Sequence, residues 1–345
     1  MNKELRIRQT AVIGAGSWGT ALAKLLGDKG EKVLLWAHKP EHVTVLRRER
    51  ENKKYLPGAR LSETVRPVTD LFEAVGNSQC VVMAVPSHGY RTVFEQLAPG
   101  LMDGALVVSV VKGIENTTLQ TMTQVMSDTL HQQNSHRAIQ LGVLSGPSFA
   151  AEVAAGQPTA VTVAFDDKEA ACAVQELFAT FFFRAYTSSD VIGLEICAAM
   201  KNVVAIAAGI GDGLGYGLNS RAALITRGLA EITRLGVKLG AQPLTFSGLG
   251  GLGDLVLTCT GGLSRNRTIG LKLGEGKSLE QALAEMTMVA EGVKTTKSCY
   301  HLAQKNAVEM PILEQTYQIL YQNKECRRAV QELFQRSLKE EIILS

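Results

Sequence analysis

The segment Gly14-Ala15-Gly16-Ser17-Trp18-Gly19 decides how the first half of this chain folds. It directly follows the apolar run 11–13 and opens an amphipathic stretch at 18–26, so it stands between a predicted strand and a predicted helix. In such a turn the first glycine permits a tight bend, the second lets the backbone approach a pyrophosphate, and the third lets helix and strand pack closely. The helix N-terminus adds N–H groups and a partial positive charge. Gly14, Gly16 and Gly19 therefore predict a dinucleotide site; a glycine-rich turn that binds nothing is the alternative.

The composition limits the class of protein around that turn. The chain has 345 residues, which favours two domains at one per ~150 residues. Its 36 basic and 33 acidic side chains leave a formal charge of +3, and 46% of the residues are hydrophobic. This balance argues against disorder and gives no reason to expect a nucleic-acid or anionic-membrane partner. The 33 glycines are clustered, so we expect the clusters to mark places where the backbone approaches a ligand.

Cysteines and apolar segments point to a soluble, cytoplasmic protein. The six cysteines contain no CxxC pair, so we expect reduced thiols, no disulfide framework and no metal site. The apolar stretch 10–26 could be mistaken for a signal peptide, but glycines and Trp18 interrupt it. The second apolar stretch, 196–211, is interrupted by Lys201 and Asn202 and falls short of the ~18 apolar residues of a membrane span.

Short β-branched runs alternate with amphipathic stretches through the first half of the chain. We expect strands at 10–13, 32–36, 80–85, 105–111, 140–144, 159–164 and 184–187. We expect helices at 18–26, 42–51, 90–97, 119–130 and 168–180. Apolar runs without alternation indicate strands buried on both faces, as in a parallel sheet covered by helices. The pattern therefore predicts an α/β fold with an N-terminal doubly wound, Rossmann-type sheet.

The character of the chain changes near Asp190. Helical spacing of Leu, Ala, Glu and Lys replaces the strand-like runs, with examples at 224–239, 279–286, 295–305 and 311–321. Pro311 suits the first turn of a helix, where its missing N–H costs nothing. We therefore predict an NAD(P)-binding domain at 1–190 and an all-α substrate-binding and catalytic domain at 191–345.

The residues after the second predicted strand bear on the choice of cofactor. An acidic residue about 20 positions after the glycine motif would bind the ribose hydroxyls of NAD. Here the strand ends Trp36-Ala37-His38-Lys39, and Glu41 follows only after a proline. His38 and Lys39 would tolerate or attract a 2′-phosphate, unless they are ordinary solvated loop residues. We expect NADPH as the cofactor, with NADH also possible.

Lys201 is the most informative single residue. It interrupts a predicted helix, 196–208, that is apolar on nearly all faces and therefore buried. A buried ammonium group without a carboxylate three or four positions away has a depressed pKa, which suits it to exchange protons near neutral pH. The alternative is a lysine whose side chain reaches solvent from a partly exposed helix.

Further polar residues stand at predicted strand ends and beside glycines. Lys112 ends a predicted strand, where ligands of open α/β sheets bind, although a solvated lysine would look the same. Ser148, in the turn that begins Ser145-Gly146-Pro147, either caps a helix or donates a hydrogen bond to a ligand.

Two later glycine clusters, 209–217 and 248–253, lead respectively to Asn219 and to Asp254. Their backbone either bends close to a ligand, presenting Asp254, or simply ends helices. The segment 261–267 places Arg265 and Arg267 with an asparagine beside glycines. Because the planar guanidinium group matches phosphate oxygens in pairs, this segment predicts a phosphate site.

Taken together, these motifs resemble the bacterial NAD(P)-dependent sn-glycerol-3-phosphate dehydrogenases. The resemblance runs essentially from end to end of the chain. It rests on GAGSWGTALA at 14–23, VPSH at 85–88, KGIE at 112–115, LSGPSFAAE at 144–152, KN at 201–202, GLGGLGDL at 248–255, SRNR at 264–267 and Met288-Val289-Ala290-Glu291-Gly292.

The resemblance implies roles for individual residues. Lys201 corresponds to the catalytic proton acceptor, and Asp254 would orient it or a substrate hydroxyl. The residues implied in cofactor binding are Gly14, Gly16, Ser17, Trp18, Gly19, His38, Lys39, Tyr55, Lys112, Ala150, Arg265, Val289 and Glu291. Those implied in substrate binding are Lys112, Gly146, Ser148, Lys201, Asn202, Asp254, Ser264, Arg265 and Asn266.

The resemblance also implies reversible hydride transfer between sn-glycerol 3-phosphate and NAD(P)+, giving dihydroxyacetone phosphate, and a role in phospholipid synthesis. We expect a homodimer. Two alternatives remain open on the residues alone: a two-domain β-hydroxyacid-type dehydrogenase that acts on a carboxylate, or a protein that senses NAD(P) without catalysis.

Overall fold

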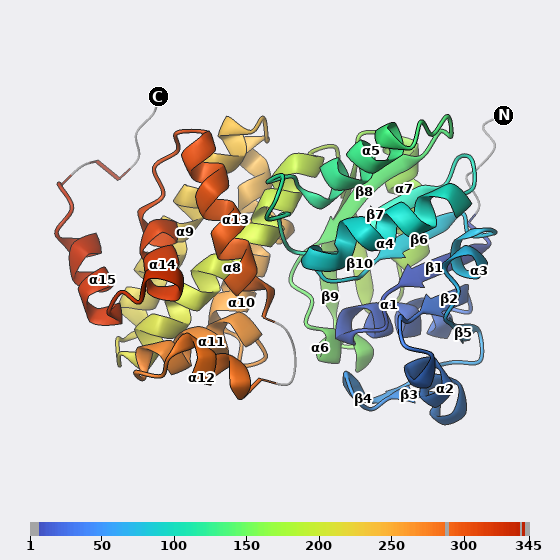
Figure 1. The fold of residues 1–345 in the computed structure, drawn as a ribbon, viewed down its shortest axis with the longest axis horizontal. Helices are drawn as coiled ribbons and strands as arrows, with labels where there is room; N and C mark the ends of the chain where they lie inside the picture. Colours follow the sequence, from blue (N-terminus) through green and yellow to red (C-terminus); the bar gives the residue numbers. More distant parts are fainter. Residues whose placement is uncertain (1–6, 287–289, 339, 342–345) are drawn as a thin grey trace.

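The computed structural model describes residues 7–286, 290–338 and 340–341 (Figure 1). A part built around a β-sheet, ending with Ser188, lies beside an all-helical part that begins at Val191. The two parts are arranged along the longest axis of the molecule (Figure 1).

The sheet has eight strands in the order β10-β9-β8-β7-β6-β1-β2-β5. Their bounds are β1 Gln9–Ile13, β2 Lys32–Trp36, β5 Val65–Val68, β6 Cys80–Met83, β7 Leu106–Ser109, β8 Gln140–Ser145, β9 Thr159–Phe165 and β10 Phe183–Ser188. The helices of this part are α1 Ser17–Asp28, α2 Pro40–Glu49, α3 Leu71–Val75, α4 Tyr90–Leu97, α5 Met122–Gln132, α6 Ala150–Ala154 and α7 Lys168–Phe178. Each predicted strand overlaps an observed strand, and the predicted α/β fold is confirmed.

The sheet is buried on both faces, as the non-alternating apolar runs predicted. Successive side chains of a strand point to opposite faces. In β1, Val12 belongs to one apolar cluster while Ala11 and Ile13 belong to the other, and all three are fully buried. Helices therefore cover both sides of the strands, and the carboxyl ends of the central strands are left as the place for a ligand.

Three features of the sheet differ from the prediction. β5 is an edge strand of sequence Val65-Arg66-Pro67-Val68. Its proline argues against a strand in a sequence-based prediction, although an edge strand tolerates proline. A hairpin of β3 (Glu51–Asn52) and β4 (Leu56–Arg60) is too short and polar to show a pattern. Finally, β9 runs antiparallel to β8, because the connection between them contains only the five-residue helix α6 and returns the chain along its own path.

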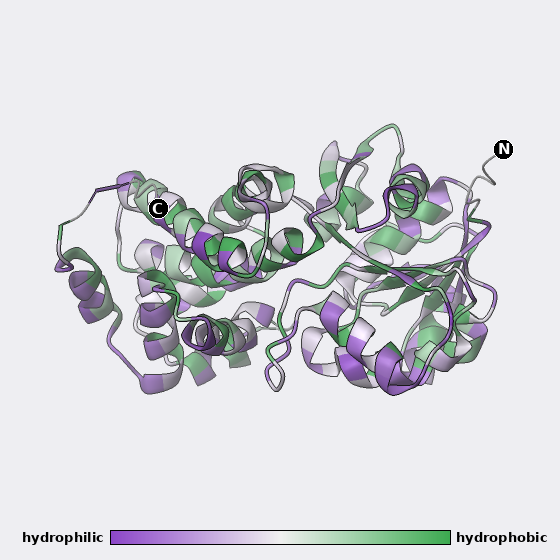
Figure 2. Cartoon of the chain, turned by 90° about the horizontal axis from the view of Figure 1, so that it is seen from above, coloured by the Kyte–Doolittle hydropathy of each residue, from purple (hydrophilic) through white to green (hydrophobic). Residues whose placement is uncertain are grey.

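The helical part is packed around one central helix, α8 (Val191–Gly213). The other helices are α9 Leu218–Lys238, α10 Asp254–Thr260, α11 Arg265–Gly274, α12 Leu279–Ala284, α13 Glu291–Lys305, α14 Pro311–Gln322 and α15 Cys326–Phe334. Hydrophilic and hydrophobic stripes alternate along the surrounding helices (Figure 2), which is typical of amphipathic helices that cover a core. Among the described residues α8 alone has the length and apolar character of a membrane span, yet 83% of its apolar window is buried inside the protein. It is a core helix.

Two glycines of the cluster at 209–217, Gly209 and Gly213, allow close helix packing. A Cβ atom at Gly209 would lie 2.0 Å from the carbonyl oxygen of Arg267, and one at Gly213 would lie 2.2 Å from that of Leu271. Gly270 of α11 likewise faces the backbone of Ile206, at 2.0 Å. Backbones of α8 and α11 therefore touch, which fixes the start of α11 beside the Lys201 helix. Gly213 is also the last residue of α8, so the helix-ending interpretation is confirmed there, whereas Gly209 lies inside the helix.

Candidate active site

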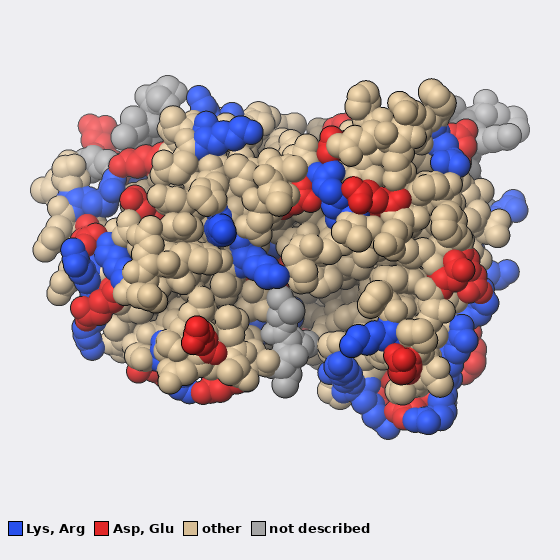
Figure 3. All heavy atoms as spheres, in the orientation of Figure 1, with Lys and Arg blue, Asp and Glu red and all other residues tan. Residues whose placement is uncertain are grey.

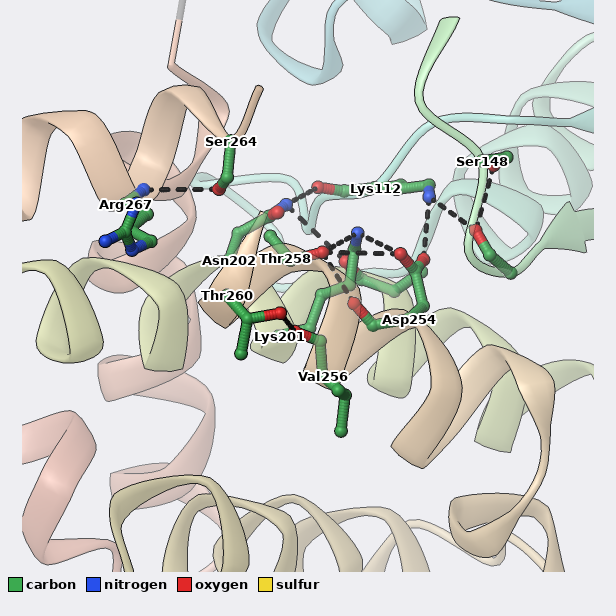
Figure 4. Close-up of polar contacts among 12 residues, drawn as sticks. Lys112, Ser148, Lys201, Asn202, Asp254, Val256, Thr258, Thr260, Ser264 and Arg267 are labelled. Atoms are coloured by element: carbon green, nitrogen blue, oxygen red, sulfur yellow. Dashed lines mark hydrogen bonds and ion pairs between the residues drawn. The ribbon is translucent and has the colours of Figure 1, made fainter. Parts of the chain in front are cut away.

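A buried carboxylate between two ammonium groups forms the centre of the site (Figure 4). Asp254 Oδ1 accepts a hydrogen bond from Lys201 Nζ at 2.6 Å, and its Oδ2 accepts one from Lys112 Nζ at 2.7 Å. Lys201 Nζ also donates to Thr258 Oγ1 at 2.7 Å. Lys201 is 5% exposed and Asp254 is 1% exposed. Three separate segments meet here: α8, α10 and the loop after β7.

The charges of this group bias it towards proton exchange. Burial lowers the pKa of Lys201 to about 7; the charge of Asp254 opposes this effect and the charge of Lys112 adds to it. Burial alone would raise the pKa of Asp254, but Lys112 and Lys201 hold it below the ordinary value. One carboxylate therefore faces two cations. The charges balance when Lys201 is neutral or when an anion binds. The lowered pKa of Lys201 has the direction that we predicted from its burial.

Asp254 reaches the site through a local distortion of the helix. Residues Leu249–Gly253 form a π-helical turn, and Asp254 is the first residue of α10. A Cβ atom at Gly251 would lie 2.1 Å from the carbonyl oxygen of Phe246, so only glycine allows this close approach. The cluster 248–253 therefore begins a helix, where the partial positive charge favours the carboxylate.

Lys112 is held by polar groups of α8 and of the segment that follows β8. Asn202 Nδ2 donates to the Lys112 carbonyl at 3.1 Å, and Lys112 Nζ donates to the Gly146 carbonyl at 3.2 Å. Ser148 Oγ donates to the same Gly146 carbonyl at 2.9 Å. The N-cap of α6 is Phe149, so the interpretation of Ser148 as a helix cap is wrong. The strand-end residues and the α8 residues thus converge on one place.

The start of α11 contains the residues that we predicted to bind a phosphate. Ser264 caps this helix by accepting a hydrogen bond from Arg267 N at 3.3 Å. The Arg267 guanidinium is bound to Asp212, with Nε to Oδ2 at 2.8 Å. Buried Asn266 accepts a hydrogen bond from Gly292 N at 3.0 Å through Oδ1. Of the two arginines, Arg265 in the first turn of α11 is the more exposed.

The glycine motif fits a dinucleotide. Gly14 has φ of +121°, and a Cβ there would lie 2.6 Å from the Ala84 carbonyl oxygen. A Cβ at Gly19 would lie 1.9 Å from the Gly14 oxygen, whereas a Cβ at Gly16 would meet no described atom within 4 Å. Gly16 thus faces open space at the start of α1, where it is the N-cap residue. A helix start of this kind favours a pyrophosphate.

Several residues implied in cofactor binding lie around this turn. Ser17 Oγ donates to the Tyr55 carbonyl at 2.6 Å. Trp18 and Ala150 pack against the same small apolar cluster beneath α1 and α6. The Trp18 Nε1 atom is buried and has no hydrogen-bond partner among the described residues. These contacts connect the hairpin β3–β4 to the glycine turn.

His38 and Lys39 are exposed at the end of β2, beside a basic surface (Figure 3). Lys and Arg side chains gather over α2, β3 and β4 in that view. The exposed cations of these elements include Arg48, Lys53 and Arg60. The surface is suited to an extra phosphate group.

Glu291 links the two parts of the protein. It is the first residue of α13, and its Oε1 accepts a hydrogen bond from Ser87 N at 3.0 Å, at the end of β6. Desolvation raises the pKa of this half-buried carboxyl, opposed by the Ser87 hydrogen bond and by the charges of Arg265 and Lys112. Val289, implied in cofactor binding, lies outside the described residues.

The structure brings the predicted site residues together in two places. Around Asp254 lie Lys112, Gly146, Ser148, Lys201 and Asn202, with the start of α11 next to them. His38, Lys39, Tyr55 and the glycine turn form the second group, around the ends of β1 and β2 and the β3–β4 hairpin. Their individual roles stay predictions.

Sequence reasoning missed two residues. Thr258 contacts Lys201, and its spacing of four residues from Asp254 on a helix is a signal that was available. Buried Asn52 donates to the Ala15 carbonyl at 2.9 Å and to Thr20 Oγ1 at 2.7 Å, which holds the glycine turn from below. A single asparagine in a polar hairpin carries no comparable signal.

Comparisons with known proteins show the family of this chain. The family model described as NAD-dependent glycerol-3-phosphate dehydrogenase N-terminus matches residues 9–171, and its C-terminal counterpart matches 190–331. The glycerol-3-phosphate dehydrogenase [NAD(P)+] of Desulfotalea psychrophila is 58% identical over 331 residues, covering 96% of this chain and 98% of its own. That of Citrifermentans bemidjiense is 56% identical with the same coverage.

Solved structures give the same result. The glycerol-3-phosphate dehydrogenase of Coxiella burnetii superimposes with a TM-score of 0.91 at 40% identity, over 95% of this chain and 99% of that one. The glycerol-3-phosphate dehydrogenase of Saccharomyces cerevisiae gives 0.81 at 28% identity, over 94% and 99%. Two family models that together match residues 9–171 and 190–331, and relatives 58% and 56% identical over almost their full length, show that the chain belongs to the NAD-dependent glycerol-3-phosphate dehydrogenase family of NAD(P)-dependent oxidoreductases.

Proposed function

We propose that this protein transfers hydride reversibly between sn-glycerol 3-phosphate and NAD(P)+, with reduction of dihydroxyacetone phosphate for phospholipid synthesis as its physiological direction. The observation that carries the proposal is the buried pair of Lys201 and Asp254, 2.6 Å apart, with Lys112 on the second oxygen of the same carboxylate. A protein that only senses NAD(P) has no need for a buried proton donor. The full-length relatives with this activity support the same conclusion.

Lys201 moves the proton in this reaction. The bound nicotinamide supplies or accepts the hydride. Lys201 Nζ, as an ammonium, donates its proton to the carbonyl oxygen of dihydroxyacetone phosphate; as a neutral amine it accepts the proton of the alcohol. A pKa of about 7 makes both forms available at neutral pH. Asp254 keeps Nζ in place and stabilises its charged form, and Thr258 fixes the direction of the remaining N–H groups.

The substrate phosphate binds at the start of α11. Arg265 supplies a guanidinium group, and Asn266 supplies its Nδ2 while Oδ1 remains on Gly292 N. Ser264 lies at the cap of the same helix, whose N–H groups favour an anion. Lys112, Gly146, Ser148 and Asn202 surround the rest of the small substrate. This arrangement positions the reacting carbon against the nicotinamide, which is the main source of acceleration for such a site.

The cofactor lies along the glycine turn, with NADPH preferred and NADH also accepted. Ser17, Trp18, Tyr55, Ala150, Val289 and Glu291 contact it. The basic surface around His38 and Lys39 supports the preference, because a 2′-phosphate would meet cations and no carboxylate is present at the end of β2 among the described residues.

Residues 1–190 form the cofactor domain and residues 191–345 the substrate domain, in a cytoplasmic homodimer. The end of the last strand at Ser188 and the start of α8 at Val191 support the division. The core position of α8 supports a protein that does not insert into a membrane.

Steady-state rates test the function. Oxidation of NADPH and NADH is followed with dihydroxyacetone phosphate and, separately, with 2-keto and 3-keto acids. We expect turnover of dihydroxyacetone phosphate with both cofactors and a higher kcat/KM with NADPH. Turnover of the keto acids alone would favour the β-hydroxyacid-type alternative, and cofactor binding without turnover would favour the sensor.

A further inference from the structure

A second buried carboxylate, Glu195, lies on α8 ahead of Lys201 and has no part in the chemistry described above. Its side chain is among the buried charges, at 3% exposure. Glu195 Oε1 accepts a hydrogen bond from Thr123 N at 2.8 Å, and Oε2 accepts one from the Thr123 hydroxyl. Thr123 lies in the first turn of α5, so the carboxylate is stabilised by the partial positive charge of that helix end.

The start of α5 is also one end of the segment that carries Lys112. We name residues 110–121 the Lys112 loop. Its two sides are joined by a bridge between Ile114 and Thr121, and Glu115 N donates to the Gln120 carbonyl at 2.9 Å. The position of Thr121 and Thr123 therefore determines the position of Ile114, two residues from Lys112.

Helix α8 holds the other end of the same loop. Asn202, the neighbour of Lys201, donates from Nδ2 to the Lys112 carbonyl at 3.1 Å. On its outer side the loop is bound by Arg91, which donates to Glu115 at 2.9 and 2.8 Å. Helix α8 therefore contacts the Lys112 loop directly through Asn202, and Glu195 of α8 binds the start of α5, where the loop ends.

We propose that Glu195 is a positioning residue of this reaction: it fixes the Lys112 loop to α8, so that Lys112 and Lys201 remain on opposite oxygens of Asp254. The inference deepens the proposed function and rests on it for the role of Lys201. The geometry of the three charged groups then depends on a contact six residues before Lys201 on α8.

Loss of the contact between Glu195 and Thr123 should change the pKa of Lys201 in a predictable direction. The charged groups that face Lys201 are Asp254 of α10 and Lys112 of the loop. If the loop moves, Lys201 loses the repulsion of Lys112 and shares Asp254 with no second cation. Both changes favour its ammonium form, so the apparent pKa of Lys201 rises. Loss of the negative charge of Glu195 alone acts in the opposite direction.

Glu195→Ala removes the contact, and Glu195→Gln removes only the charge, because an amide still accepts from Thr123 N and can donate to the hydroxyl. Glu231→Ala is the matched control. Glu231 on α9 is 4% exposed and accepts hydrogen bonds from Ile312 N at 2.7 Å and Leu313 N at 3.2 Å. It is therefore also a buried carboxylate at a helix start, but at α14 and away from the lysines.

The experiment measures kcat/KM for dihydroxyacetone phosphate against pH, NADPH binding by fluorescence, and thermal stability. We expect Glu195→Ala to lower kcat/KM by about 10- to 100-fold, as small misplacements of reacting groups do, to move the pH profile to higher pH and to leave NADPH binding unchanged. Glu195→Gln should keep most of the activity and the profile. Glu231→Ala should lower stability without moving the profile.

Two further measurements keep the test decisive. If Glu195→Ala does not fold, Glu195→Asp replaces it; its shorter carboxylate should show the same shift in smaller degree. The pH dependence of Lys201 labelling by an amine-reactive reagent, followed by mass spectrometry, reports the Lys201 pKa without turnover, so a failure of the proposed function does not obscure this one. An unchanged profile and labelling curve in the Glu195 variants, or an equal shift in Glu231→Ala, would overturn the positioning role.

Discussion

Lys201 Nζ lies 2.6 Å from Asp254 Oδ1, although 53 residues separate the two in the chain. The pair joins the central helix α8 to the start of α10, and Lys112 completes it from the sheet-containing part. Burial makes the ammonium form of Lys201 costly, and the shared carboxylate keeps that cost small enough for the lysine to titrate near neutral pH. The contact therefore explains both the placement of Lys201 and its suitability as a proton donor.

Replacement of the lysine should stop the chemistry and spare the fold. Lys201→Met keeps an unbranched apolar chain in a buried position and removes the proton donor. We expect kcat to fall by roughly 10²- to 10⁴-fold, the usual contribution of a general acid, while NADPH still binds with its original affinity. Steady-state assays and fluorescence titration check this. Turnover within a few-fold of the unmodified protein would remove Lys201 from the mechanism.

Asp254→Asn should affect both stability and pH dependence. The variant leaves Lys201 and Lys112 without their shared carboxylate, and breaking a buried ion pair costs about 3–5 kcal/mol. Because burial and repulsion by Lys112 then act on Lys201 without opposition, its pKa should fall and the activity profile should move to lower pH.

Urea unfolding and pH–rate profiles measure the two effects. Glu285→Gln is the control, because the exposed Glu285 carboxylate is also bonded to two lysines, Lys272 and Lys277. An exposed ion pair contributes little to the free energy of unfolding, so this variant should lose little stability. Equal losses of stability in the two variants would contradict the prediction.

Two glycines of the motif, Gly19 and Gly16, should affect different properties when replaced: stability and cofactor binding, respectively. Gly19→Ala places a Cβ 1.9 Å from the Gly14 oxygen and should lower the melting temperature, whereas Gly16→Ala meets no described atom within 4 Å and should leave it nearly unchanged. Gly16→Ala should instead raise the KM for NADPH, since its methyl group occupies the space of the pyrophosphate. Calorimetry and kinetics on both variants check this, and a stable Gly16→Ala protein with normal KM would argue against the dinucleotide site.

Charge at the end of β2 should decide between the cofactors. Lys39→Glu places a carboxylate where a ribose 2′-phosphate would lie, so kcat/KM with NADPH should fall while that with NADH is kept or rises. Lys32→Glu is the matched control at the opposite end of the same strand, and it is also exposed. Parallel changes with both cofactors, or equal effects of the two substitutions, would show that Lys39 does not select the phosphate.

Glu231 should make stability depend on pH. Burial raises its pKa from 4.5 to about 7, against the lowering effect of the Ile312 and Leu313 hydrogen bonds. The folded state then binds more protons than the unfolded state between these values. The stabilising contribution of protonated Glu231 to the free energy of unfolding is fully present below pH 4.5 and is lost as the pH rises through 7. The free energy of unfolding, relative to Glu231→Gln, should therefore fall by about 3 kcal/mol across this range. Parallel curves in urea titrations would contradict the assignment.

The extent to which the sequence predicted the fold depended on the strength of each local pattern. The strand Lys32–Trp36 and the helix Tyr90–Leu97 have the predicted bounds, because apolar runs and helical spacing mark them clearly. β5 was missed because an edge strand needs no apolar pattern and tolerates its proline. The reversal of β9 was missed because strand direction depends on pairing, which no single segment encodes.

For the site, residue types were predictable and partners were not. The sequence by itself determined a dinucleotide turn at 14–19, a lysine in a buried helix and the resemblance to one dehydrogenase family, because each of these is a local pattern. Only the tertiary structure decided that Asp254 stands between Lys201 and Lys112, that Arg267 is bound to Asp212, and that Glu195 binds Thr123 at the start of α5. The physical reason is that a charge buried at one point of the chain is stabilised by whichever group the packing of distant helices brings within hydrogen-bond distance, and that packing depends on the whole core.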